Sequence, residues 1–188
     1  MPAAYTHDSF GMEVLRILPR EEKELILSEA NLFHIGLQGP DLFFYYHPLK
    51  ADPVSELGHA IHREPGLAFL KRMAAAEGKT LPDDRKDPSA GAGDKARSVK
   101  AEDKALSAAK RAFIYGNICH FVLDRECHGN IFHWQEVSGV THAEIEGEMD
   151  RSLMLRNGDD PLRTMPARHI RPGRREARIL KEFYPELS

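Results

Sequence analysis

The stretch from residue 101 to residue 127 constrains the fold of this chain more than any other segment. Its first half repeats apolar residues at helical spacing, and its second half is apolar on nearly every side. A helix that is apolar all round must be buried among other elements. The segment therefore predicts a central helix that other helices surround.

Apolar residues also recur at helical spacing in the rest of the chain. The further predicted helices cover residues 9–18, 21–33, 53–62, 64–76, 141–155 and 174–183. Thr141 and Glu144 have the spacing of a capping box, which marks the start of one of these helices. Residues 36–41 are too rich in Gly and Pro for a helix and are interpreted as irregular chain. Residues 42–46 could form a short strand, but no partner strand is evident, so they are interpreted as a packed turn. The sequence predicts an all-α fold, a helical bundle.

Length and composition bound the domain organisation. A chain of 188 residues can build one domain with a substantial core, so we expect a single domain over residues 1–188. Residues 77–100 are rich in Gly, Pro, Ser, Asp and Lys and predict a flexible loop. Prolines from about residue 156 onward predict an irregular C-terminal tail with one short helix. Cys119 and Cys127 would lie about 12 Å apart on one helix, too far for a disulfide, and are expected to be free thiols.

The chain carries no obvious targeting or membrane signal. No apolar run approaches the roughly 20 residues that cross a bilayer. The N-terminal residues lack a basic segment followed by an apolar one, so we expect a cytoplasmic protein. A formal net charge of −3 gives no general argument for nucleic-acid binding.

Three polar residues interrupt the central apolar helix at four-residue intervals. His120, Asp124 and His128 therefore share one helix face. The two histidines lie about 12 Å apart along the axis, too far to share one ion comfortably. Asp124 sits midway, where a carboxylate could bridge two adjacent metal ions. The alternative is a buried hydrogen bond between His120 and Asp124.

A second pair follows on the next predicted helix. His142 and Glu146, four residues apart, can bind one ion from a single helix face. The alternative is that both side chains lie on a solvated surface, where such pairs are common.

Other candidates are weaker when taken alone. Asp41 lies in a Gly-Pro-Asp turn, where it binds metal or forms an Asx turn. One of His59 and His62 is expected to be a ligand and the other exposed. His7 is either a ligand or an exposed residue near the N-terminus. The remaining histidines are assigned structural or exposed roles: His34, His47, His133 and His169.

The order of these motifs resembles the zinc-dependent phospholipase C family, especially its small bacterial branch. The resemblance covers residues 1–155 and rests on the following motifs: His7, Gly39-Pro40-Asp41, Gly58-x-x-x-His62, His120-x-x-x-Asp124-x-x-x-His128 and His142-x-x-x-Glu146. That branch opens Met-Pro-Ala and carries a Leu-Gln-Gly-Pro-Asp segment, as this chain does. The family shares a helical architecture for three zinc ions with the single-strand-specific zinc nucleases.

The resemblance implies which residues hold zinc. It assigns one Zn²⁺ to Asp41, His62, His120 and Asp124, and a second to His128, His142 and Glu146. A third would be held by His7 and the bridging Asp124, completed in the family by the N-terminal amine and carbonyl of a mature Trp. This chain has no Trp near its start, so it departs from the family pattern at the third ion.

The resulting hypothesis is zinc-dependent hydrolysis of a phosphodiester, with phospholipid or another diester as substrate. Asp41 is the candidate catalytic residue, orienting or deprotonating the attacking water as well as, or instead of, binding metal. The aromatic residues 43–46 beside it would form an apolar wall for a lipid or, alternatively, part of the core. One rival is a single-strand nuclease, and another is a non-catalytic protein whose zinc only holds helices together.

Overall fold

The computed structural model describes residues 4–47, 52–77 and 92–187, with only the backbone of Glu77, residues 92–102 and Leu187. Within these ranges the chain forms helices and no strand, which confirms the all-α prediction. The elements are α1 Ala4–Ile17, α2 Arg20–Ser28, α3 Ala30–Gly36, η1 Gly39–Tyr45, α4 Pro53–Arg63, α5 Gly66–Glu77, α6 Ala92–Ser138, α7 His142–Arg156, α8 Arg174–Phe183 and η2 Pro185–Leu187. None of the described helices is long and apolar enough to cross a membrane.

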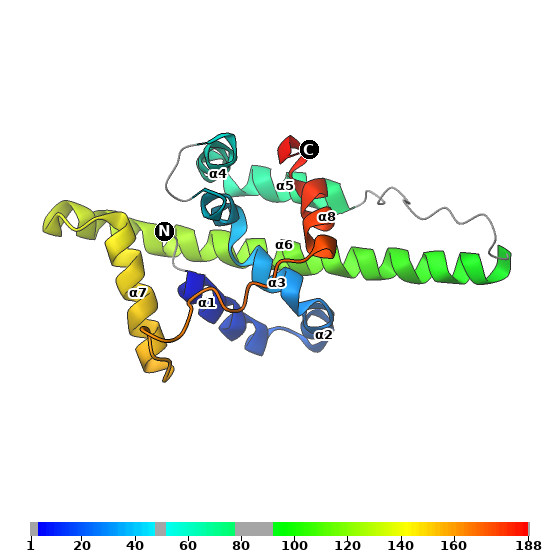
Figure 1. The fold of residues 1–188 in the computed structure, drawn as a ribbon, viewed down its shortest axis with the longest axis horizontal. Coiled ribbons are helices and arrows are strands. Elements are labelled where there is room, and N and C mark those ends of the chain that lie inside the picture. The colour runs from blue at the N-terminus through cyan, green and yellow to red at the C-terminus, as the bar shows by residue number, and fades with distance from the viewer. Residues whose placement is uncertain (1–3, 48–51, 78–91, 188) are drawn as a thin grey trace.

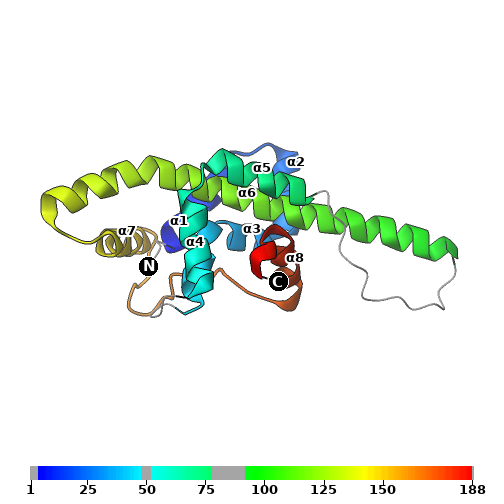
Figure 2. The same ribbon diagram turned by 90° about the horizontal axis from the view of Figure 1, so that it is seen from above.

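The long helix α6 is the centre of the fold. Its 47 residues extend for about 70 Å, and the other helices gather around its middle part while α7 folds back from its C-terminal end (Figures 1 and 2). Phe113 packs in one apolar cluster with Phe69 and Tyr184, whereas Ala112 packs in a second cluster with Phe33. The central-helix prediction is confirmed, because α6 contributes side chains to both cores.

The backbones of α3 and α6 touch where they cross. A Cβ atom on Gly36 would lie 2.3 Å from the carbonyl oxygen of Phe113. A Cβ atom on Gly116 would lie 2.4 Å from the carbonyl oxygen of Phe33. Both distances are impossible for a real side chain, so this crossing requires glycine on each helix.

The predicted helix over residues 21–33 is broken. It divides at Glu29, whose φ of −131° and ψ of 38° end α2 and begin α3. The carboxylate of Glu29 pairs with both terminal nitrogens of Arg175, at 2.8 Å each. On either side of the break, Ile26 on α2 enters one apolar cluster and Leu32 on α3 enters the other.

Two further expectations were wrong in part. Residues 39–45 form the 3₁₀ helix η1, with Pro40 in its first turn and Phe43 packed edge-on against Tyr184 at 4.8 Å. The expected loop over residues 77–100 includes residues 78–91, which lie outside the described residues, but residues 92–100 belong to α6. The Ala, Lys and Arg residues of that segment are strong helix formers and extend the central helix.

Other expectations agree with the structure. The tail is irregular between α7 and α8, and α8 has the predicted bounds. Cys119 and Cys127 are free thiols. Helix α1 begins earlier than predicted, at Ala4, and so takes His7 into a helix.

We expect alanine substitutions at two glycines of α6 to change stability in opposite directions. Gly116→Ala should lower the free energy of unfolding by at least about 2 kcal/mol, because the methyl group meets the backbone of α3. Gly129→Ala should raise it by up to about 1 kcal/mol, because nothing lies within 4 Å and alanine favours the helix. Urea denaturation of both variants measures the difference. Equal effects would contradict the close crossing.

Candidate metal centre

Asp124 on α6 lies among three histidines. Its Oδ2 atom is 3.2 Å from Nε2 of His120, and its Oδ1 atom is 3.4 Å from Nε2 of His7. His128 is also adjacent, with Nδ1 3.8 Å from the same Oδ1 atom. The two carboxylate oxygens thus face different imidazoles, which is the arrangement that a bridging ligand needs.

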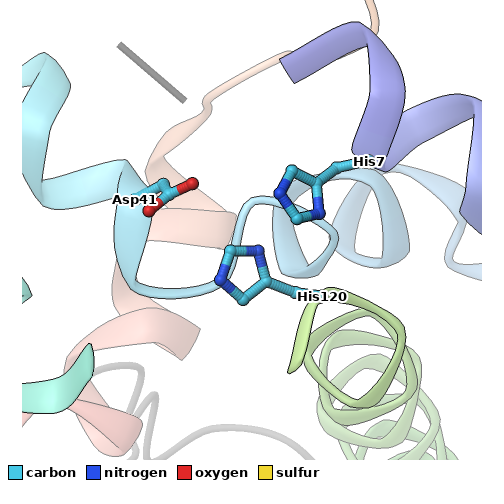
Figure 3. A group of neighbouring side chains, drawn as sticks. All are labelled: His7, Asp41 and His120. Carbon is cyan, nitrogen blue, oxygen red and sulfur yellow. The ribbon is translucent and has the colours of Figure 1, made fainter. Parts of the chain in front are cut away.

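Helix α1 and the 3₁₀ helix η1 bring two more groups to His120. The ring of His7 stacks on the ring of His120 with centroids 4.4 Å apart. Asp41 approaches from η1, and potential ligand atoms of these three residues lie within 4.8 Å of one another (Figure 3). Gly39 permits this approach, because its φ is +51° and a Cβ atom there would lie 2.4 Å from the His120 ring.

Helix α4 supplies His62. Its Nδ1 atom donates to the carbonyl oxygen of Gly58 at 2.8 Å, which leaves Nε2 facing Oδ1 of Asp41 at 2.8 Å. Burial alone would lower the pKa of His62, but Asp41 raises it above its ordinary value. His59 instead packs on the ring of Phe44 and joins none of the ligand groups among the described residues. Of the two histidines left open by the sequence, the structure places His62 at the centre.

The predicted pair of His142 and Glu146 lies close to a third residue, His128 on α6. Nε2 of His142 lies 2.9 Å from Oε1 of Glu146, and the rings of His142 and His128 are 5.1 Å apart. Burial raises the pKa of Glu146. The capping box of Thr141 and Glu144 fixes the start of α7, so the pair lies in its first two turns and faces α6.

All eight candidate residues fall into three adjoining groups. The groups are His7, Asp41 and His120; His62, His120 and Asp124; and His128, His142 and Glu146. The groups join through His120, which two of them share, and through the neighbouring Asp124 and His128. That these residues hold zinc stays a prediction.

The donor atoms suit a bound cation. Within the described residues, Nδ1 of His7 and Nε2 of His120 are buried and make no hydrogen bond. The latter lies close to Asp124 but is not aligned for a hydrogen bond, and an unsatisfied buried nitrogen is costly. Burial would raise the pKa of Asp124, but the imidazoles of His120 and His7 lower it well below its usual range. Imidazoles with an ionised carboxylate form a typical zinc ligand set.

Asp150 is a residue near this centre whose role the sequence did not reveal. It is 7% exposed, and its carboxylate accepts from the backbone N–H groups of Tyr5 at 3.1 Å and Thr6 at 2.7 Å. It therefore caps the N-terminus of α1 from α7. Asp150 lies four residues after Glu146, as Glu146 does after His142. This spacing places Asp150 on the same face of α7 and was the sequence signal that could have indicated its role. The contact ties the helix that carries His7 to the helix that carries the second group.

The four histidines assigned structural or exposed roles lie outside the three groups. His34 nevertheless has a close partner, because its Nδ1 atom is 2.6 Å from Oδ1 of Asp8. Nε2 of His169 lies 3.2 Å from the amide nitrogen of Gln38. These contacts join α1, α3 and the C-terminal tail beside the centre.

We expect the protein to bind at least two zinc ions per chain and to lose them when Asp124 is changed. Asp124→Asn removes one negative charge between three imidazoles, whereas Glu148→Gln changes a side chain that is 58% exposed. Elemental analysis of both variants and the wild type gives zinc per chain. A wild-type value near one after zinc supplementation, or equal occupancy in the two variants, would contradict this arrangement.

We expect Asp150→Ala to weaken the part of the centre that contains His7. Losing the cap should lower the free energy of unfolding by about 1–2 kcal/mol. Zinc per chain after a mild chelator wash should fall, while the His128, His142 and Glu146 group retains its ion. Asp160→Ala, which changes a half-exposed carboxylate, is the matched control. If the two variants keep equal stability and zinc content, Asp150 does not position α1.

Comparison with known proteins identifies the family. The family model described as zinc dependent phospholipase C matches residues 6–185. No curated protein and no solved structure matches the chain. The family match spans α1 to the start of η2 and includes all eight candidate ligands. The chain belongs to the zinc-dependent phospholipase C family.

Proposed function

We propose that this protein hydrolyses phosphodiesters and prefers phospholipid, or a similar lipid-like diester, over single-stranded nucleic acid. Membership of the family supports a zinc-dependent hydrolase of the phosphodiesterase type. The observation that carries the proposal is the convergence of three potential ligand groups around Asp124. A structural zinc needs only four ligands, and this centre offers twice as many side chains.

The exposure of the centre supports catalysis over a purely structural role. The side chains of His62, His128 and His142 are 28%, 28% and 32% exposed, so one side of the centre is open to solvent. Structural zinc sites are closed, whereas catalytic sites keep a position for water or substrate.

Asp41 lies where a residue that orients or deprotonates the attacking water is expected. Its side chain is only 7% exposed, and His62 holds Oδ1 at 2.8 Å. One carboxylate oxygen points toward His7 (Figure 3). Zinc bound at the centre would supply positive charge for the phosphoryl oxygens and would lower the pKa of a bound water. Asp41 would then orient that water or accept its proton.

Apolar side chains at the edge of the centre support a lipid substrate. Phe132 is 55% exposed, and its ring lies 5.6 Å from that of His128 and 5.8 Å from that of His142. Phe44 stacks on His62 at 5.5 Å. Phe43, by contrast, is buried, so that part of the aromatic run belongs to the core.

Two arginines of the C-terminal region are already paired with carboxylates, which bears on the nuclease alternative. Both terminal nitrogens of Arg168 are bonded to Asp159, at 3.0 and 2.9 Å. Arg175 is paired in the same way with Glu29. The charges of these two arginines are already balanced, whereas a nucleic-acid groove needs cations that are free to meet phosphates, so these two give little support to a nuclease.

We expect zinc-loaded protein to turn over a chromogenic phosphodiester and phosphatidylcholine vesicles faster than single-stranded DNA. Asp41→Asn should reduce turnover at least about 100-fold, because the carboxylate that orients or deprotonates the water is lost. Asp160→Asn is the matched control and should leave turnover unchanged. Faster cleavage of DNA would favour the nuclease. An absence of turnover at full zinc occupancy would favour structural zinc.

A further inference from the structure

We propose that a cavity beside α3 binds the phosphate group of a small phosphomonoester. The cavity lies between α3 and the irregular segment that joins α7 to α8, and its volume is about 500 Å³, within the range of small-molecule sites. No candidate metal ligand lines it, so the inference goes beyond the proposed function and does not depend on it. The lining residues are Ala30, Asn31, His34, Arg168, His169 and Arg171.

Arg171 supplies positive charge at the edge of the cavity. Its side chain is exposed and forms no ion pair with any residue that the structure describes. Nδ2 of Asn31 donates a hydrogen bond to the carbonyl oxygen of Arg171 at 2.8 Å, which holds this residue beside α3. A guanidinium group binds phosphate oxygens through two parallel N–H donors. Arg171 is therefore the residue on which recognition of an anion depends.

Arg168 adds ordered N–H donors but little net charge. Its two terminal nitrogens donate to the carboxylate of Asp159 at 3.0 and 2.9 Å, so its charge is balanced. The hydroxyl group of Tyr5 also donates to that carboxylate, at 2.8 Å. A guanidinium group has five N–H donors, of which Asp159 accepts two, so three remain for a ligand.

Two imidazoles cover the carboxylate of Asp8, which does not line the cavity. Nδ1 of His34 lies 2.6 Å from Oδ1 of Asp8, and Nδ1 of His169 lies 3.7 Å from Oδ2. Gln38 donates to Nε2 of His169 at 3.2 Å, which places the proton of His169 on Nδ1, facing Asp8. The negative charge of Asp8 is thus met by imidazole N–H groups.

His34 can share a proton with a phosphate group. Because Nδ1 is engaged by Asp8, Nε2 is the nitrogen left to meet a ligand, and the side chain is 21% exposed. The second pKa of a phosphate monoester is about 6, close to that of an imidazole, so either group can hold the proton between them. A carboxylate ligand has no such proton near neutral pH. This difference favours phosphate over carboxylate.

Charge and size narrow the ligand further. The acidic side chains of the adjoining segments are already engaged: Asp8 by two imidazoles, Asp159 by Arg168, and Glu29 and Glu176 by Arg175. The unbalanced cation of the lining is Arg171, which suits a single phosphate group and not a polyanion. The cavity is larger than a phosphate ion, which leaves room for a small organic group.

We expect glycerol 3-phosphate, added to the full zinc-loaded chain, to change the ring nitrogen signals of His34. Nuclear magnetic resonance of protein with isotope-labelled histidine measures the change, and the His34 signals are identified by their absence from the variant His34→Gln. This readout separates the cavity from the candidate metal centre, where zinc would also attract phosphate. Changes confined to the candidate zinc ligands would overturn the inference.

Two exposed arginines provide a matched pair of variants. Arg171→Gln should raise the concentration of glycerol 3-phosphate that gives half of the His34 change at least about tenfold, because the unbalanced cation is lost. Arg156→Gln removes a charge that is likewise exposed and unpaired among the described residues, but outside the lining, and should bind as the wild type does. Circular dichroism checks that both variants are folded. Equal affinities of the two variants would overturn the inference.

Other ligands and the rate of hydrolysis complete the test. Acetate should leave the His34 signals unchanged at concentrations at which glycerol 3-phosphate saturates them, and equally tight binding of acetate would overturn the choice of phosphate. Excess zinc that changes the signals of His34 and His169 together would show a cation site and would also overturn it. Arg171→Gln should hydrolyse the soluble chromogenic diester at the wild-type rate. Loss of binding with unchanged turnover supports a cavity outside the centre, whereas equal loss of both would overturn the inference.

Discussion

Where α3 crosses α6, two glycines remove the side chains that would otherwise keep the helix backbones apart. Gly36 and Gly116 each face a carbonyl group of the other helix at a distance that no Cβ atom could occupy. The chain that leaves α3 consequently runs directly over His120. The carbonyl oxygen of Leu37 comes within 3.3 Å of Nδ1 of His120, and Gly39 passes against its ring. Backbone packing thereby fixes which side of the His120 ring faces Asp124.

Backbone carbonyl groups orient three of the candidate ligands in the same way. His120 is held by Leu37, His62 by Gly58 and His128 by the carbonyl group of Asp124, at 3.3, 2.8 and 2.8 Å. In each case Nδ1 is engaged by the carbonyl oxygen, so Nε2 is the nitrogen left to act as a metal ligand, which fixes the tautomer as well as the direction of the ring. Helical spacing produces the bonds of His62 and His128, since each of these histidines lies four residues after its partner. The centre is thus organised largely by helix geometry.

The parts of the structure that depend on local spacing could be predicted from the sequence. The central helix, the capping box at Thr141 and the alignment of His120 with Asp124 all follow from periodicity. The break at Glu29 could not be predicted, because it depends on Arg175 and on packing against α6. Asp150 was missed for a similar reason, since its partners are backbone groups of a distant helix. The start of α6 was misjudged because glycine, serine and charged residues indicated a loop although helix formers lay among them.

The cap that Asp150 provides for α1 joins residues that are 144 and 145 positions apart in the chain. Closing so long a loop is entropically costly until the intervening helices have packed. During synthesis, α1 leaves the ribosome long before α7 exists, so it has no cap from α7 while the central helix is being made. We therefore expect His7 to reach its final position only when α7 docks. The candidate centre would then be completed among the last steps of folding, and its integrity would report that the chain has been made at least through α7.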